Sequence, residues 1–190
     1  MSDISVRGKD VTCTGAWIET FTGKKFHLLD PQPDEICIED IAHALSNQCR
    51  YTGHTKRFFS VAEHSWHVCK LCEHPMTGLL HDASEAYLSD LSRPVKQLTP
   101  VGPPYYEVED RMMRAIAEKF DFHWPMPKDV KEADNAMLLA EKAQLMTALS
   151  WSDDESSEEV RKIATPNVRL ACWTPEAAEK LFLQKFYDLA

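Results

Sequence analysis

Hydrophobic residues recur every three to four positions over most of this chain, which is the spacing of one face of an α-helix. After the break at Pro31–Asp34, one such face carries Ile38, Ile41, Ala42 and Leu45. Later segments repeat the spacing, and several begin at a proline or at a residue that can cap a helix. The pattern predicts further helices over Ser60–Cys72, Met76–Leu88, Tyr105–Phe120, Pro127–Leu149 and Pro175–Leu189.

Two short segments ahead of these helices are typical of β-strands. They are Trp17–Phe21 and Lys25–Leu29, and they flank Thr22, Gly23 and Lys24. Glycine adopts the backbone angles of a tight turn more easily than other residues do. We therefore expect a small β-hairpin at the start of an otherwise helical chain.

Local signals predict where some helices begin and where the chain leaves them. Glu63 follows Ser60 by three residues, a capping-box pattern that predicts a helix start at Ser60. Beyond Leu88, residues that disfavour a helix predict a stiff loop; they are Pro94, Pro100, Gly102, Pro103 and Pro104.

These elements predict a mostly α fold, a helical bundle with a small N-terminal β-hairpin, in a single domain over residues 1–190. Residues 1–35 would hold the hairpin and an extension, and residues 36–149 the helical core with the metal-ligand candidates. Residues 150–190 would hold an acidic loop, Ser152–Glu159, and the C-terminal helix. Such an acidic run is typical of a solvated loop.

Composition narrows the class of protein. The chain has 190 residues, 44% of them hydrophobic, but no apolar run that approaches the roughly 20 residues of a membrane span. Its first residues lack the pattern of a signal peptide, and its six cysteines lack a framework spacing, so we expect a cytoplasmic protein with reduced thiols. The net charge of −9 argues against binding to duplex DNA, which requires many basic contacts.

Two histidines and two aspartates are candidates for a metal site. His81 and Asp82 are adjacent, His64 lies on an earlier predicted helix, and Asp134 lies on a later one. Neighbouring residues on a helix point about 100° apart, so His81 and Asp82 can share an ion only in a groove between packed helices. The alternative is a hydrogen-bonded core pair, but a buried carboxylate is costly unless a cation neutralises it.

Two other histidine-containing stretches offer alternative chemistry. His67–His74 contains two cysteines and two histidines and resembles half of a zinc knuckle, but no second ligand pair follows at a suitable spacing. His54 lies in a predicted loop, where it would contact a phosphate or cap the next helix.

The motifs around the metal candidates resemble those of the HD-domain metal-dependent phosphohydrolases, a family named after its His-Asp pair. The resemblance runs from Trp17 to Leu145, and its core stretches are Ser60–Ser65, His81–Glu85, Asp90–Lys96 and Lys131–Asp134. The loop Asp90–Lys96 is similar to that of bacterial 5′-deoxynucleotidases. Trp17–Gly23 and Cys49–His54 look most like phage members, some of which are dATP triphosphohydrolases.

The resemblance implies His64, His81, Asp82 and Asp134 as ligands of a divalent transition metal. Imidazole and carboxylate ligands suit zinc, cobalt, manganese or iron, and additional magnesium would accompany the phosphates. Glu85 would act as a general acid or base or orient a water. The alternative interpretation is that Glu85 is a surface carboxylate without a catalytic role.

Further residues are candidates for contacts with substrate. Asp90 would orient the same water or hold the sugar. Arg50, Lys96 and Lys131 would bind phosphate oxygens, the arginine through both arms of its guanidinium. Tyr51 would stack on a base, although an aromatic residue beside a helix end is core packing about as often.

The function implied is metal-dependent hydrolysis of deoxynucleotide phosphoesters, with dATP cleaved to deoxyadenosine and triphosphate. The first alternative is a 5′-deoxynucleotidase acting on monophosphates, and the second is a non-catalytic nucleotide-binding protein. The resemblance also implies a homo-oligomer, active in a host cytoplasm if the chain is phage-encoded.

Overall fold

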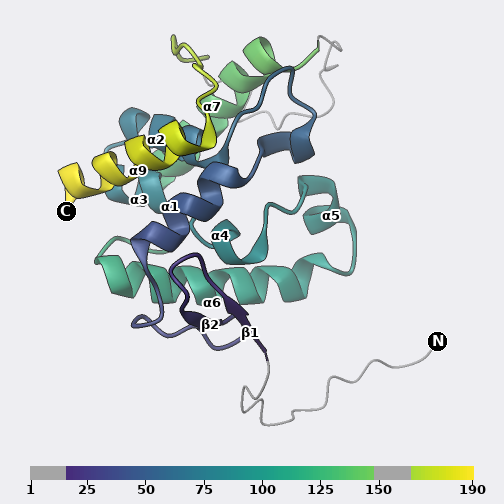
Figure 1. Cartoon of the computed structure of the whole chain (residues 1–190). Helices are drawn as coiled ribbons and strands as arrows, with labels where there is room; N and C mark the ends of the chain where they lie inside the picture. Colours follow the sequence, from purple (N-terminus) through teal and green to yellow (C-terminus); the bar gives the residue numbers. More distant parts are fainter. Residues whose placement is uncertain (1–15, 148–163) are drawn as a thin grey trace.

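A computed structural model describes residues 16–147 and 164–190 of the chain. The described part is mostly α-helical with one small two-stranded sheet, as the sequence predicts (Figure 1). The predicted acidic loop, Ser152–Glu159, lies outside the described residues.

The N-terminal hairpin is confirmed, although its strands are shorter than predicted. Strands β1 (Trp17–Glu19) and β2 (Lys25–His27) pair antiparallel, with Ile18 opposite Phe26. Gly23 occupies the turn at a φ of +79°, a backbone region that favours glycine. The backbone and hydroxyl of Thr22 both donate to the Asp40 carboxylate, which fixes the hairpin to the first helix.

The helices follow in chain order and pack around two apolar clusters. They are α1 (Ile38–Asn47), the short 3₁₀ turn η1 (Arg50–Gly53), α2 (Val61–Leu71), α3 (Pro75–Leu80), α4 (Glu85–Leu88), α5 (Arg93–Leu98), α6 (Gly102–Phe120), α7 (Lys128–Leu145) and α9 (Pro175–Leu189). Within the described residues, every helix is too short or too polar to cross a lipid bilayer.

The predicted helix Met76–Leu88 is wrong as one element, because the structure divides it at His81. Helix α3 ends at Leu80, and α4 begins at Glu85. Between them the backbone N–H of Ala83 donates to the Leu80 carbonyl and that of Glu85 to the Asp82 carbonyl, both at 3.0 Å. These bonds span three residues instead of four, so the chain tightens at His81 and Asp82.

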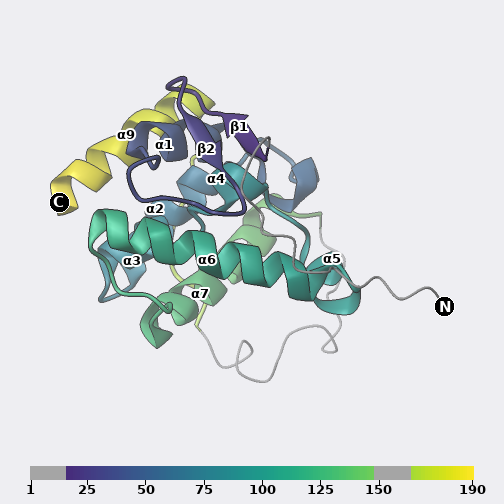
Figure 2. The ribbon, with the colours of Figure 1, turned by 90° about the horizontal axis from the view of Figure 1, so that it is seen from below.

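The predicted proline-rich loop is also partly wrong. Pro94 lies in the first turn of α5, and Pro103 and Pro104 lie in the first turn of α6. The first amides of a helix have no partner within the helix, so a proline there removes no hydrogen bond. Figure 2 shows α6 running across the molecule with α5 at one of its ends.

Helix α7 ends at Leu145, four residues earlier than Leu149, the predicted end. Met146 has extended backbone angles, and the Leu145 carbonyl accepts a hydrogen bond from the backbone N–H of Lys56 at 2.9 Å. A partner from another part of the chain therefore replaces the next helical turn.

Helix α2 lies between the two clusters of the core. Val61 and Ala62 belong to a large cluster built with α1, α3, α6 and α9, whereas Val68 belongs to a smaller cluster built with α7. In Figure 1, α9 lies alongside α1 and α2. Any polar side chain on the central turns of α2 is therefore shielded from solvent.

The predicted cap of α2 is confirmed, but the capping box is formed only in part. The Ser60 hydroxyl accepts from the backbone N–H of Glu63 at 3.0 Å. The Glu63 carboxylate accepts instead from three consecutive backbone N–H groups, those of Ala171, Cys172 and Trp173, at 2.6–3.0 Å. This carboxylate ties α2 to the segment that leads into α9.

Candidate metal centre

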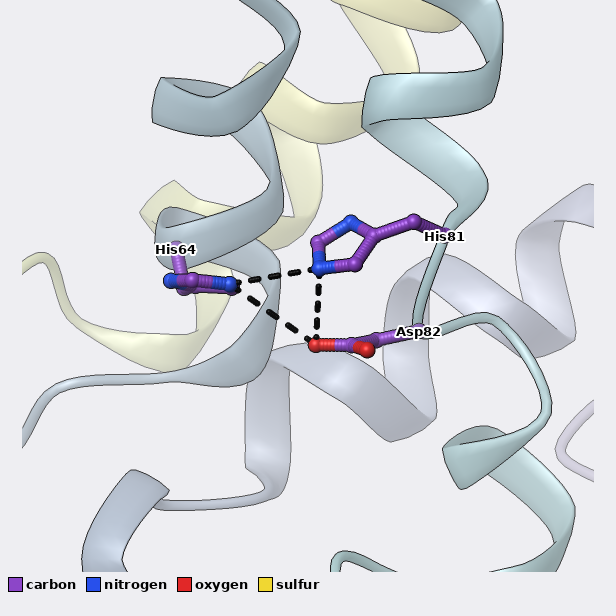
Figure 3. Close-up of side chains that lie close together, drawn as sticks. All are labelled: His64, His81 and Asp82. Carbon is purple, nitrogen blue, oxygen red and sulfur yellow. Dashed lines mark hydrogen bonds and ion pairs between the residues drawn. The ribbon is translucent and has the colours of Figure 1, made fainter. Parts of the chain in front are cut away.

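Three elements bring the predicted ligands together. His64 lies in the middle of α2 and is fully buried. His81 and Asp82 occupy the tight turn after α3, and Asp134 projects from α7. Figure 3 shows the rings of His64 and His81 and the carboxylate of Asp82 facing one another across a small gap.

The facing atoms are separated by short distances. The Nε2 atoms of His64 and His81 are 3.3 Å apart, and Asp82 Oδ2 lies 3.1 Å from His81 Nε2 and 3.8 Å from His64 Nε2. Among the described residues, these three form the group whose potential ligand atoms all lie within 4.8 Å of one another.

Asp134 lies at the edge of this group. Its Oδ1 is 3.4 Å from His64 Nε2, and its Oδ2 accepts from Lys131 Nζ at 2.8 Å. The tight cluster therefore has three members, and the fourth predicted ligand adjoins it through His64.

Hydrogen bonds behind each imidazole leave the Nε2 atoms available. His64 Nδ1 donates to Glu141 Oε1 at 2.5 Å, and His81 Nδ1 donates to the Gly78 carbonyl at 2.9 Å. A histidine that donates from Nδ1 carries its free lone pair on Nε2 when the ring is neutral. Both lone pairs then face the same gap.

The chemistry of this donor set fits a divalent transition metal. Two nitrogens bound tetrahedrally to one zinc ion at about 2.0–2.1 Å lie roughly 3.3 Å from each other. The observed separation of the two Nε2 atoms is 3.3 Å. Imidazole and carboxylate donors together suit zinc, cobalt, manganese or iron.

The carboxyls of the group carry negative charge. Burial alone would raise the pKa of Asp82, but the neighbouring His81 and His64 outweigh it and lower that pKa. The pKa of Asp134 is lowered well below its ordinary value against the effect of burial, through a hydrogen bond with His64 and the charges of His81, His64 and Lys131. A cation is therefore favoured at their centre.

His64 itself gains a proton in the absence of a metal. Burial and the charge of Arg50 oppose protonation, but Glu141 and Asp134 outweigh them and raise the pKa of His64 to about 9. A metal ion has to displace this proton when it binds to Nε2.

Glu85 differs from the two aspartates because it favours its neutral form. It opens α4, is 6% exposed, and its Oε2 has no hydrogen-bond partner among the described residues. Burial, together with the charges of Asp82 and Asp90, raises its pKa well above the ordinary value. A buried carboxyl group that keeps its proton can act as a general acid.

The predicted phosphate-binding residues surround the group in different ways. Lys96 Nζ lies 3.9 Å from Glu85 and 3.0 Å from Glu109, above the ring of Tyr105. Lys131 is about half exposed beside Asp134. Lys131 therefore adjoins the group through Asp134, whereas Lys96 is paired with Glu109 and lies near Glu85.

The polar groups of Arg50 and Tyr51 are partly engaged within the protein. Arg50 Nε and Tyr51 Oη each donate to Glu141 Oε2 at 3.0 Å, and Arg50 Nη1 lies 3.8 Å from Asp82 Oδ2. Glu141 is a functional candidate that the motifs of the sequence do not indicate. Its position seven residues after Asp134, on the same face of one helix, is a signal that could have indicated it.

The histidines of the other two stretches do not belong to this metal-ligand group. The ring of His67 stacks on Trp173, and His74 Nδ1 donates to Asp129 Oδ1 at 2.9 Å. His54 is exposed. In residues 16–147 and 164–190, these histidines belong to no further group of three potential metal ligands.

Fold and site together define a mostly α-helical protein in which two buried histidines and a partly exposed aspartate face one another, with Asp134 of α7 beside them. No family model matches the chain. The chain is 36% identical over 179 residues to the uncharacterized protein YfdR of Escherichia coli (strain K12), a match that covers 92% of this chain and 96% of YfdR. It therefore belongs to the same family as YfdR.

A second relative is an uncharacterized protein of Rhodobacter capsulatus. The two chains are 38% identical over 132 residues, which is 64% of this chain and 66% of the relative.

Proposed function

We propose that the protein is an HD-domain metal-dependent phosphohydrolase that hydrolyses deoxynucleotide phosphoesters. The observation that carries the proposal is the convergence of His64, His81 and Asp82, with both imidazoles presenting Nε2 to one gap. The resemblance of the motifs around these residues to the HD-domain family supports the same assignment.

The site offers a division of roles for this reaction. A divalent cation held by His64, His81, Asp82 and Asp134 would acidify a water molecule and polarise a phosphate. Glu85, neutral and buried beside the group, would donate its proton to the oxygen that leaves the phosphorus. Asp90 raises the pKa of Glu85 and would orient the attacking water or hold the sugar.

Three cationic side chains would bind the phosphate oxygens. Arg50 Nη1 lies 3.8 Å from Asp82 Oδ2, whereas Lys96 and Lys131 lie on α5 and α7. Their charges would offset the repulsion between a polyphosphate and the acidic residues of the site. Tyr51 is a weaker candidate for base stacking, because its hydroxyl is engaged by Glu141.

The substrate that we propose is dATP, which would be cleaved to deoxyadenosine and triphosphate. Attack of water on the α-phosphorus breaks its bond to the 5′-oxygen, which leaves with a proton as the nucleoside hydroxyl. The phage-like stretches Trp17–Gly23 and Cys49–His54 support this choice. A 5′-deoxynucleotidase would use the same groups on a monophosphate and release inorganic phosphate.

A nucleotide screen tests the proposal. The purified chain is incubated with common nucleoside mono- and triphosphates in zinc, cobalt, manganese and magnesium in turn, and products are separated by chromatography. Deoxyadenosine and triphosphate from dATP support the proposal, whereas turnover confined to monophosphates identifies the 5′-deoxynucleotidase. Nucleotide binding without any product in all four metals overturns the enzymatic assignment.

Removal of one ligand tests the metal site directly. Asp82→Ala should abolish turnover and strip the metal, and because metal binding stabilises the folded state, it should lower the melting temperature of the metal-loaded protein. The readouts are elemental analysis and thermal unfolding, with the exposed Glu132→Gln as control. An Asp82→Ala variant with unchanged metal content would contradict the ligand assignment.

A further inference from the structure

Glu141 is a fully buried carboxylate with no part in the reaction proposed above. It lies on α7, two turns beyond Asp134, and its two oxygens have separate partners. Oε1 accepts from His64 Nδ1 at 2.5 Å, whereas Oε2 accepts from Arg50 Nε and Tyr51 Oη, both at 3.0 Å. Oε1 therefore accepts from the metal-site histidine, while the donors Arg50 and Tyr51 both use Oε2.

The charge of Glu141 is supported from several sides. Burial would raise its pKa, but Arg50, His64 and Tyr51 outweigh burial and lower it. A buried carboxylate is tolerated only where cations and hydrogen bonds compensate its lost hydration. Glu141 meets that condition through these three side chains.

The backbone at η1 supports the same arrangement. Tyr51 and Thr52 adopt left-handed angles, with φ of 55° and 53°, although neither is a glycine. Such angles cost free energy and persist where surrounding contacts enforce them, commonly at functional sites. Here they accompany the hydrogen bond from Tyr51 to Glu141.

A carboxylate behind a ligating histidine has two physical effects. It fixes the ring so that Nδ1 carries the hydrogen and Nε2 the lone pair, and it makes Nε2 a stronger donor to a metal. Loss of such outer partners typically weakens metal binding by about 10–100-fold. The carbonyl of Gly78 holds His81 in the same sense, but it is uncharged.

We propose that Glu141, held in place by Arg50 and Tyr51, is a positioning residue that orients His64 and strengthens it as a metal ligand. The proposal rests on the metal site of the proposed function, but not on the identity of the substrate. It also gives Arg50 and Tyr51 a role in building the metal site that is independent of substrate contact.

The test compares Glu141→Gln with Glu132→Gln in the full chain. Both changes remove one charge from α7, but Glu132 is exposed and pairs with Lys128 on the same helix. Metal-free protein is titrated with Co²⁺ against a competing chelator, and we expect Glu141→Gln to lose about 10–100-fold in affinity. Glu132→Gln should bind Co²⁺ within about twofold of the unchanged chain, since an exposed charge contributes little.

A second readout separates positioning from a merely structural role. At saturating Co²⁺, the visible absorption of the ion reports the donor strength of its ligands, so Glu141→Gln should shift the spectrum. Tyr51→Phe keeps the carboxylate but removes one of its donors, so its loss of affinity should be intermediate.

The outcomes distinguish this inference from the proposed function. A Glu141→Gln variant with unchanged Co²⁺ affinity and spectrum overturns the inference, even if its melting temperature falls. Wild-type chain that binds no Co²⁺ overturns it as well. If the wild type binds Co²⁺ tightly, the variants behave as expected and no nucleotide is hydrolysed, the inference stands and the proposed activity fails.

Discussion

At the scale of single residues, the carboxyl groups around the site differ in protonation because their neighbours differ. Asp82 and Asp134 face imidazoles, which keep their pKa values low against burial. Glu85 is buried, and burial together with the charges of two aspartates raises its pKa. Two anionic ligands and one neutral acid can therefore coexist in one site.

This contrast predicts the behaviour of Glu85→Gln. The amide cannot release a proton, so turnover should fall by roughly 10²–10⁴-fold, while metal content stays unchanged. Measurement of kcat and bound metal checks this, with the exposed Glu107→Gln on α6 as control. Turnover within tenfold of the unchanged enzyme would remove Glu85 from the chemistry.

Stability of the metal-free protein provides a second readout for the same variant. Because the folded state raises the pKa of Glu85, the unfolded chain loses this proton first as pH rises above the ordinary value. The wild type should therefore lose stability from about pH 4.5 upwards through this group. Glu85→Gln should lack this contribution in chemical unfolding measured across that range.

At the scale of elements, the close approach of α2 and α3 places His81. A Cβ at Gly78 would lie 2.5 Å from Cys72 Sγ and 3.0 Å from the backbone Cα of Cys69, so no larger residue fits without movement. The Gly78 carbonyl also accepts from His81 Nδ1. Helix packing and ligand orientation therefore depend on the same glycine.

Gly78→Ala should accordingly affect stability and metal binding together. Overpacking at such a site costs about 1–3 kcal/mol of the free energy of unfolding, and displacement of the carbonyl should weaken metal affinity. Chemical denaturation and Co²⁺ titration measure the two effects. Adding Cys72→Ala should recover part of the stability by removing the nearest atom, and no recovery would show that the Cys69 backbone is the obstacle.

At the scale of the whole molecule, the candidate metal centre joins three elements that are distant in sequence. Its residues come from α2, from the turn after α3 and from α7, which also pack against one another. A cation bound there would link these elements only in the folded state. Metal should therefore raise the melting temperature, and the stabilisation should grow with the logarithm of the free metal concentration once that concentration exceeds the Kd.

The same coupling between metal binding and protonation predicts that the apparent metal affinity depends on pH. The metal-free fold raises the pKa of His64 to about 9, so a metal must displace a proton below that pH. Apparent Co²⁺ affinity should fall by about tenfold for each pH unit below 9 through this group. Calorimetry in buffers of different ionisation enthalpy should detect close to one proton released at pH 7, and release of none would contradict this picture.

The stability of the metal-free protein should change with pH in the opposite direction to the metal affinity, because it falls as pH rises. The raised pKa of His64 stabilises the fold fully below about pH 6.5, the value in an unfolded chain, and this contribution is lost as pH rises to about 9. Thermal unfolding of metal-free protein at pH 6, 7.5 and 9 checks the direction.

The sequence by itself determined the features that depend on nearby residues. The hairpin around Gly23, the Ser60 cap and the apolar face of α1 are confirmed, because turn residues, caps and helical spacing act over a few positions. The grouping of His64 with His81 and Asp82 also follows the prediction, and Asp134 adjoins it. The metal and the reaction remain predictions.

Only the tertiary structure decided which partner each buried polar group meets. The Glu63 carboxylate accepts from backbone N–H groups that lie 108 to 110 positions later in the chain. Glu141 accepts from a histidine that lies 77 positions earlier. The break at His81 and the early end of α7 likewise depend on contacts that the local pattern does not contain. Side-chain spacing can indicate a face, but the atom opposite that face is set by how the helices pack.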